Sequence, residues 1–184
     1  MPLTTAKTVS FTKPQRGGAQ AADFRPVNAD ITFYRRSEGV DAYVRAFSSA
    51  TPMQIVAVEM KGLEGILIKD ISKRLGIPAS QFYSILVVPK ATAEKKATAG
   101  QLVTGRGGQA AIGMVKLLGI AQNIVENSTA KEANGFDSAK WLGQWIERPQ
   151  PALDGRKPAD LIGTPTGVEV VARLLGSIES GAYQ

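Results

Sequence analysis

The sequence predicts an all-α protein, because apolar residues recur at the spacing of a buried helical face in three separate segments. These segments are 40–47, 114–125 and 168–178. The composition of the 184 residues is that of a folded protein, with 43% hydrophobic and 21% charged residues. Apolar runs fall far short of a membrane span and no hydrophobic signal core opens the chain, so we expect a soluble, cytoplasmic protein.

The first 39 residues are expected to form a flexible arm. Up to about residue 30 they are rich in Thr, Lys, Gln, Gly and Ala and show no apolar periodicity. The Ile-Thr-Phe-Tyr segment 31–34 is either a short strand or a hydrophobic anchor at the end of this arm.

Two short helices are predicted after the arm. The first spans 40–47, with an apolar face formed by Val40, Tyr43, Val44 and Phe47. The second opens at Pro52, since proline is tolerated in the first turn of a helix. Its apolar residues are Ile55, Val56 and Met60.

Residues 66–88 have the pattern of a helix-turn-helix motif. The first helix ends at Gly76, which suits a left-handed residue after a helix, and Ser80 is the expected N-cap of the second. Ser72 is small enough for the contact between the two helices. The expected core residues are Ile68, Ile71, Leu75, Phe82, Ile85 and Leu86. A generic helical hairpin would use the same caps and is the alternative.

The second helix of this motif would be the reader of a DNA major groove. Its outward residues are expected to be Gln81, Tyr83 and Ser84, none of which is an Arg or Lys that could pair with guanine. The basic residues that follow would meet phosphates: Lys90, Lys95, Lys96 and Arg106. Since such a weak reader is useful only in pairs, operator binding would require a dimer.

Charge is unevenly distributed along the chain. The net charge is +3 over residues 1–50, +4 over 51–110 and −1 over 111–184. A basic first half makes a polyanion such as DNA a plausible partner, although a solvated basic surface would have the same composition.

The residue types available argue against catalysis. The chain has no Cys and no His, which excludes their use as nucleophiles or bases, disulfides and ordinary zinc sites. No nucleophile motif or convergent carboxylate cluster stands out either. We therefore expect a binding protein rather than an enzyme, with no metal and no cofactor.

A loop and a long helix are predicted in the middle of the chain. Residues 97–109 are rich in Gly, Thr and Gln and lack the Gly-Lys-Ser/Thr step of a phosphate loop. A helix then runs from Gln109 to about Asn127. Its wide apolar stripe indicates a helix that is buried or lies between partners, and comprises Ile112, Met114, Val115, Leu117, Leu118, Ala121, Ile124 and Val125.

Two more helices are predicted near the C-terminus. Asp137 is the N-cap of the first, with Phe136 and Trp141 as a hydrophobic staple. Trp141 and Trp145 are either core residues, the commoner case, or a binding platform. After a turn-rich stretch and a short helix at 159–163, Thr164-Pro165 starts the last helix, whose apolar face is Val168, Val171, Leu174, Leu175 and Ile178.

The C-terminal residues resemble one family signature: the toxin-binding domain of the Xre/MbcA/ParS antitoxins, partners of RES-domain toxins. The likeness covers about residues 40–184 and places a helix-turn-helix (Xre-like) region before a small helical toxin-binding domain. It rests on Trp141-Leu142, Pro151-Ala152-Leu153-Asp154-Gly155-Arg156-Lys157-Pro158, Asp160-Leu161-Ile162, Thr164-Pro165-Thr166-Gly167 and Leu174-Leu175-Gly176-Ser177-Ile178-Glu179-Ser180-Gly181-Ala182-Tyr183. Two departures are Gln150, where the family usually has Asn, and Val87-Val88-Pro89-Lys90, where relatives commonly have an Arg-rich run.

The resemblance implies an antitoxin that inhibits a toxin acting on NAD, either by NAD degradation or by ADP-ribose transfer. In such complexes the C-terminal segment of the antitoxin enters the toxin's active-site cleft, whereas the residues alone would suggest a frayed end. The resemblance therefore assigns toxin binding to Arg173, Ile178, Glu179, Ala182, Tyr183 and Gln184. Arg156 and Lys157 would meet an acidic rim on the toxin or lie on a solvated turn.

Three regions follow from these arguments: a flexible arm (1–39), an Xre-like helix-turn-helix region (40–108) and a toxin-binding helical domain (109–184). The partners expected are a RES-domain toxin, operator DNA and a second copy of the chain. The alternative is a transcriptional regulator whose C-terminal domain only mediates dimerisation; it would bind its operator without any toxin.

Overall fold

A computed structural model gives the fold of the chain and describes residues 30–128 and 135–179. The all-α prediction is confirmed, since most of the described residues are helical. The α-helices are α1 (Gly39–Ser48), α2 (Pro52–Lys61), α3 (Gly65–Leu75), α4 (Ala79–Ile85), α5 (Lys90–Thr98), α6 (Gly105–Glu126), α7 (Ser138–Trp145) and α8 (Pro165–Glu179). Two 3-10 turns, η2 (Pro151–Leu153) and η3 (Pro158–Asp160), lie between α7 and α8.

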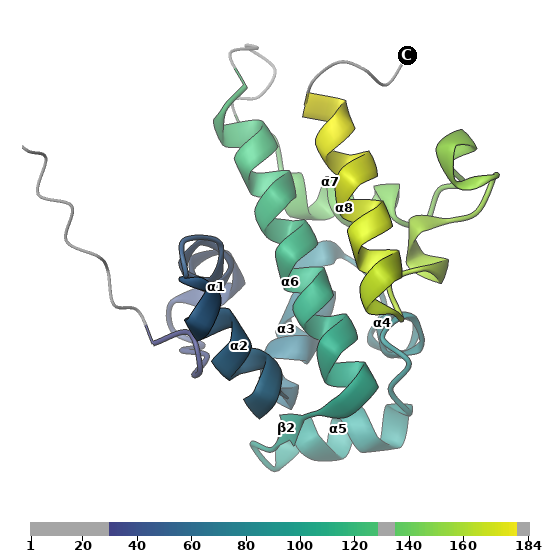
Figure 1. Cartoon of the computed structure of the whole chain (residues 1–184). Coiled ribbons are helices and arrows are strands. Elements are labelled where there is room, and N and C mark those ends of the chain that lie inside the picture. The colour runs from purple at the N-terminus through teal and green to yellow at the C-terminus, as the bar shows by residue number, and fades with distance from the viewer. Residues whose placement is uncertain (1–29, 129–134, 180–184) are drawn as a thin grey trace, which may run out of the picture.

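The two strands are short and join distant parts of the chain. Strand β1 (Leu63–Glu64) pairs antiparallel with β2 (Leu102–Val103), with Leu63 opposite Val103. This pairing closes the segment that contains α3, α4 and α5 into one unit beside the start of α6 (Figure 1).

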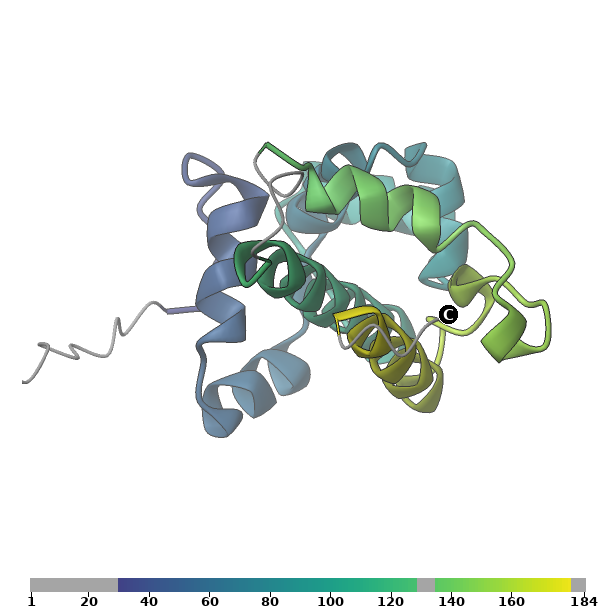
Figure 2. The same ribbon diagram turned by 90° about the horizontal axis from the view of Figure 1, so that it is seen from above.

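Helix α6 is the centre of the molecule, and α1, α7 and α8 pack around it (Figures 1 and 2). Its middle is buried on almost every side, as the width of its apolar stripe predicted. Gly113 and Gly119 allow the close approach of neighbouring helices, because a Cβ atom at Gly113 would collide with Val168 of α8 and one at Gly119 with Ser48 of α1. The core built on α6 is continuous from Ile31 to the last helix.

The middle of the chain is more ordered than we expected. The prediction of a loop at 97–109 is wrong, since this range contains the end of α5, strand β2 and the start of α6. Helix α5 was missed because its buried residues are only Ala93 and Ala97, which give no apolar stripe. Helix α6 begins at Gly105, four residues before the expected Gln109.

The helix-turn-helix segment folds into two helices joined at Gly76, which has a left-handed conformation (φ 73°). Ser72 is buried at the helix contact as expected. The prediction that Ser80 caps the second helix is wrong: α4 begins at Ala79, Pro78 is the N-cap residue, and Ser80 lies in the first turn. Phe82 and Leu86 are buried, whereas Ile85 is only partly buried.

Helix α2 lies at the edge of the molecule (Figure 1). Its start is as predicted, with a capping box between Thr51 and Gln54. Its apolar residues do not form a core face, however: Val58 is buried, whereas Val56 and Met60 are exposed.

The described part of the expected arm is anchored to the helices. Ile31 is buried and its carbonyl oxygen accepts a hydrogen bond from the Tyr43 hydroxyl (2.9 Å). Arg36 forms an ion pair with Asp70 of α3 (2.9 Å). Of the two alternatives for residues 31–34, the anchor is confirmed and the strand is not.

None of the helices that the structure describes has the length and apolarity needed to cross a bilayer.

Candidate functional site

Helix α7 begins as the sequence predicted. The Asp137 carboxylate accepts the Lys140 N–H (3.1 Å), and the rings of Phe136 and Trp141 are 6.2 Å apart, in the contact expected of a hydrophobic staple. The rings of Trp141 and Trp145 stack at 6.0 Å. Trp145 is buried and Trp141 packs against the core, so these residues are core residues rather than an exposed platform.

Arg74 of α3 holds the start of α7 in place. Its Nε atom lies 2.9 and 3.0 Å from the two carboxylate oxygens of Asp41, and its Nη1 atom lies 2.6 Å from Oδ1 of Asp137. Gln122 of α6 donates a further hydrogen bond to Asp41 (3.3 Å). Three helices are thereby joined to the N-cap of α7. Sequence reasoning missed this network, because its hydrogen-bonded partners lie up to 81 positions apart in the chain.

The charges of this network are stabilised mutually. Burial tends to raise the pKa of Asp137, but hydrogen bonds from Arg74 and from the Lys140 N–H outweigh it, so the pKa is lowered. Burial likewise tends to lower the pKa of Arg74, whereas the hydrogen bonds to Asp137 and Asp41 raise it. Both groups therefore stay charged, and the ion pair persists at neutral pH.

The turn before η3 is fixed by backbone hydrogen bonds around Gln150. Its carbonyl oxygen accepts the N–H groups of Leu153 and Gly155, and its own N–H donates to the Arg156 carbonyl. Asp154 and Gly155 adopt positive φ angles of 54° and 74°. The side chain of Gln150 is buried and Arg156 is exposed, so the turn presents a basic side chain from a defined backbone.

Helix α8 starts at Thr164, as the sequence predicted. The Thr164 hydroxyl accepts the Gly167 N–H (3.1 Å), and glycine is needed there because a Cβ atom would collide with the Leu161 carbonyl. The buried face that packs on α6 consists of Val168, Val171, Leu174 and Leu175. The end of α8 is thereby held in a fixed direction relative to α6 (Figure 1).

The residues that the resemblance assigned to toxin binding are placed only in part. Arg156 and Arg173 are exposed, and Ile178 is half-buried against the core. Lys157 forms an ion pair with Glu147 (3.4 Å). Glu179 is the last residue of α8, and the remaining three lie outside the described residues: Ala182, Tyr183 and Gln184.

The expected outer face of α4 is smaller than predicted. Gln81 and Ser84 are exposed. The prediction for Tyr83 is wrong: its side chain is buried, and its hydroxyl donates a hydrogen bond to Glu94 of α5 (3.1 Å). Burial, with the adjacent carboxylate, raises the pKa of Tyr83 to about 12, while a hydrogen bond from Lys69 lowers the pKa of Glu94.

The basic residues after α4 differ in their surroundings. Lys90 and Lys95 are exposed on α5. Lys96 instead donates a hydrogen bond to the Leu102 carbonyl (2.6 Å) and helps to hold β2 against α5. Arg106 donates from Nε to the Gly163 carbonyl (3.0 Å), which links the start of α6 to the start of α8. Arg106 is exposed like Lys90 and Lys95, whereas Lys96 is half-buried, so three of the four basic residues are accessible to phosphates.

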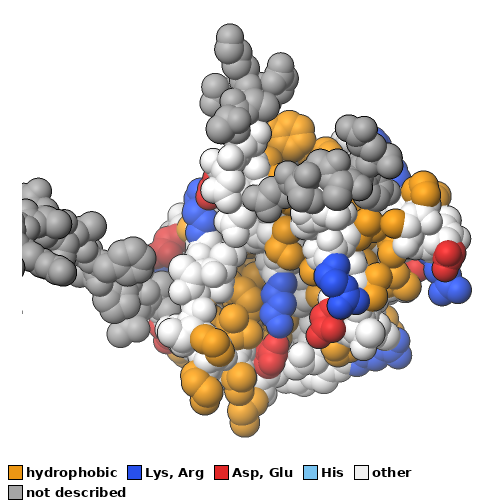
Figure 3. Space-filling model, turned by 45° about the horizontal axis from the view of Figure 1, so that its top comes forward, with side chains coloured by type: hydrophobic (Ala, Val, Ile, Leu, Met, Phe, Trp, Pro, Cys, Tyr) orange, Lys and Arg blue, Asp and Glu red, His pale blue; other side chains and the backbone are white. Residues whose placement is uncertain are grey.

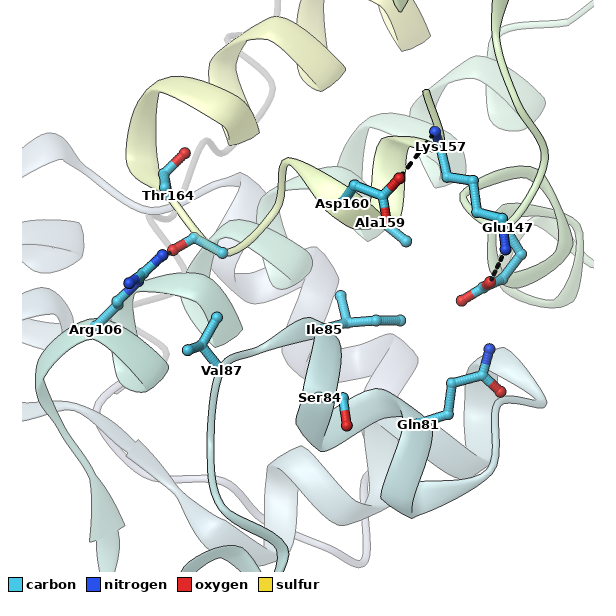
Figure 4. Close-up of a pocket in the computed structure, with 11 residues that line it drawn as sticks. Gln81, Ser84, Ile85, Val87, Arg106, Glu147, Lys157, Ala159, Asp160 and Thr164 are labelled. Carbon is cyan, nitrogen blue, oxygen red and sulfur yellow. Dashed lines mark hydrogen bonds and ion pairs between the residues drawn. The ribbon is translucent and has the colours of Figure 1, made fainter. Parts of the chain in front are cut away.

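A cleft of about 330 Å³ separates α4 from the segment before α8 (Figure 4). We call it the α4 cleft. Gln81 and Ser84 lie on one wall, and Glu147, Lys157 and Asp160 lie on the other, while Arg106 borders one end. Val87 also lines it, in a left-handed conformation (φ 56°) that is strained for a β-branched residue. No pattern in the sequence signals this conformation.

An exposed apolar face lies on α2. Figure 3 shows hydrophobic side chains gathered at the lower left of its view, on the side where α2 lies in Figure 1. Met53, Val56 and Met60 are 74%, 40% and 82% exposed. Since these residues are spaced three and four apart, they form one stripe along the helix. We call it the α2 stripe.

Among residues 30–128 and 135–179, no group of three Asp, Glu, Cys or His side chains lies close enough together to hold a metal ion.

The fold is that of a helical protein with exposed surfaces for a partner, and the family comparison identifies its C-terminal part. Residues 134–181 match the model of the antitoxin Xre/MbcA/ParS C-terminal toxin-binding domain. The range covers α7, the turns and α8, which are the elements built around Asp137, Gln150 and Thr164.

A relative of known family extends the likeness over most of the chain. The Prs ADP-ribosylating antitoxin of Sphingobium sp. (strain YBL2) is 34% identical over 139 residues, which cover 76% of this chain and 86% of that protein. The chain therefore belongs to the Xre/MbcA/ParS antitoxin family, as the C-terminal resemblance indicated. Membership implies that its partner is a toxin.

Proposed function

We propose that this protein is the antitoxin of a type II toxin–antitoxin system, and that it neutralises a RES-domain toxin that acts on NAD. It works in the cytoplasm and has no catalytic activity of its own. Its C-terminal segment enters the active-site cleft of the toxin and blocks access of NAD. The observation that carries the proposal is the match of residues 134–181 to the family's toxin-binding domain. The name of the Sphingobium relative favours ADP-ribose transfer over NAD degradation as the toxin's reaction.

The anchoring of α8 supports this mechanism. Four buried side chains and the Thr164 cap fix the helix on α6. A segment presented from a rigid helix loses less conformational entropy on binding than one presented from a loose chain. A site that binds the aromatic base and the phosphates of NAD would accept the ring of Tyr183 and the carboxylate of Glu179.

The proposal includes a homodimer, for which the α2 stripe is the best-supported interface. Met53 and Met60 are the most exposed large hydrophobic side chains among the described residues. Methionine adapts to irregular surfaces, and contiguous exposed apolar residues commonly mark interaction sites. An isologous contact would place one stripe on the same stripe of a second copy.

The proposal also includes contact with operator DNA, mainly through phosphates. Lys90 and Lys95 are both exposed on α5, and residues 51–110 carry a net charge of +4. Operator binding without any toxin, with a steep dependence on salt, would instead favour a transcriptional regulator whose C-terminal domain only mediates dimerisation.

The experiment that tests the antitoxin function removes residues 181–184. The protein is co-expressed with the toxin encoded beside it, and complex formation and NAD consumption are measured. We expect the full chain to suppress NAD loss and the truncated chain to fail, while removal of residues 2–5 as a control has no effect. Full protection by the truncated chain would refute the insertion mechanism, and no complex with the full chain would refute the antitoxin function.

A further inference from the structure

The α4 cleft is built from both halves of the chain. One wall comes from α4 and the start of α6, which precede the matched toxin-binding domain. The other wall comes from Glu147, Lys157, Ala159 and Asp160, which lie inside it. The cleft therefore lies between the matched toxin-binding domain and the helices that precede it in the chain.

The two walls are held at a fixed distance. Arg106 donates a hydrogen bond across the end of the cleft to the Gly163 carbonyl (3.0 Å), and Val87 lies so close to Gly163 that an added Cβ atom would be 2.8 Å from its Cγ2 atom. Val87 keeps a left-handed conformation there (φ 56°), which is strained for a β-branched residue. Strain of this kind is often found at functional sites, where the surrounding structure maintains it.

The size and charge of the cleft do not favour DNA as its occupant. A volume of about 330 Å³ admits a few side chains but not a duplex. Its lining carries two cations, Arg106 and Lys157, and two anions, Glu147 and Asp160, so it offers no net positive charge to phosphates. The helix that reads the groove in a helix-turn-helix motif therefore faces a wall of its own protein.

The lining suits a segment of a protein instead. Ile85, Val87 and Ala159 supply an apolar surface, while Lys157 and Glu147 supply both signs of charge. Such a mixture fits a loop that inserts an apolar side chain between polar neighbours, as in the buried centres and polar rims of protein interfaces.

We propose that the toxin contacts the α4 cleft, so that its footprint extends from the C-terminal domain to Gln81 and Ser84 of α4. This inference rests on the proposed antitoxin function and adds a second contact to the C-terminal segment. It makes the outer face of α4 a toxin-binding surface rather than a reader of bases. DNA contact then remains with Lys90 and Lys95, outside the cleft.

The test is the affinity of the purified toxin for the full chain and its variants, measured by calorimetry. Ser84→Trp would fill the cleft, and Thr92→Trp is the matched control, because Thr92 is an exposed polar residue of α5 that does not line the cleft. We expect Ser84→Trp to weaken binding about tenfold or more and Thr92→Trp to leave it unchanged. Circular dichroism checks folding, and Gln81→Arg replaces Ser84→Trp if that variant is unfolded.

The outcomes separate the two proposals. If the wild type binds the toxin and the folded cleft variant binds it with the same affinity, the cleft inference is overturned and the antitoxin function stays intact. Wild-type protein that does not bind the toxin would overturn both, since no footprint would then exist. Equal losses in Ser84→Trp and Thr92→Trp would also overturn the cleft inference, because the loss would not depend on this site.

Discussion

Replacing Arg74 by methionine is the most direct test of how α7 is held in place. The guanidinium makes three short hydrogen bonds to two carboxylates, and its side chain is 29% exposed. Hydrogen bonds to charged groups contribute about 1.5–3 kcal/mol when buried, whereas exposed ion pairs contribute about 0.2–1 kcal/mol. For this intermediate exposure we expect the free energy of unfolding to fall by about 2 kcal/mol.

Acid should reduce the difference in unfolding free energy between the wild type and the Arg74→Met variant. The folded-state pKa of Asp137 is lowered, so its contribution to stability is present above its ordinary pKa of 3.8 and is lost as the pH falls through the folded value. The variant lacks the guanidinium that lowers this pKa. Its stability should therefore depend less on pH than that of the wild type between neutral pH and pH 3.

Urea unfolding followed by circular dichroism at pH 7 and at about pH 3 measures both effects. Asp137→Asn is a useful companion variant, because Asn is as good an N-cap as Asp but cannot form the ion pair. The double variant then gives the coupling energy of Arg74 and Asp137. A loss below about 0.5 kcal/mol for Arg74→Met, within the range of ordinary surface substitutions, would refute the argument that this network stabilises the fold.

Three further predictions concern packing, assembly and ionisation. Gly113→Ala should lower the free energy of unfolding by about 1 kcal/mol, because the added Cβ atom would collide with Val168. Gly176→Ala should raise it by about 0.5–1 kcal/mol, because the added Cβ atom meets no atom within 4 Å and alanine favours the helix. Thermal unfolding of both variants measures these changes. Met60→Glu should convert a dimer to a monomer in light-scattering measurements with little change in helix content, and a dimer that persists would exclude the α2 stripe as the interface. Because the folded-state pKa of Tyr83 is raised to about 12, its contribution to stability should be lost as the pH rises from about 10 to 12; a tyrosine absorbance titration in which every residue ionises near 10 would contradict this.

The sequence predicts the helices that bury a wide or regular apolar face. It also predicts α2, from the proline at its start, but it misses α5. Helices α1, α6 and α8 were predicted because leucine, valine and aromatic residues repeat along them. Helix α5 buries only alanines, so local periodicity could not show it. Tyr83 was expected at the surface for a related reason: its burial depends on Glu94 of a helix that the pattern does not reveal.

The candidate site divides in the same way between local and distant contacts. The caps at Asp137 and Thr164 depend on hydrogen bonds to residues three positions away, and the sequence predicts both. The Arg74 network and the α4 cleft depend on residues brought together by the fold. The family resemblance supplied the toxin partner, but the opposite walls of the cleft belong to regions that the sequence treated as separate.

The two functional regions of the chain are therefore one mechanical unit in the described structure. Arg74 joins α3 to the cap of α7, Arg106 joins the start of α6 to Gly163, and the core around α6 is shared by both. A toxin bound to the C-terminal region would contact a unit that also contains α4 and α5. Because packed helices resist gradual deformation, contact with the toxin would either leave the position of Lys90 and Lys95 unchanged or shift it as a whole. If the proposed DNA contact is made, any influence of the toxin on it would follow from access to α5 and from the number of copies assembled, rather than from a flexible link between two domains.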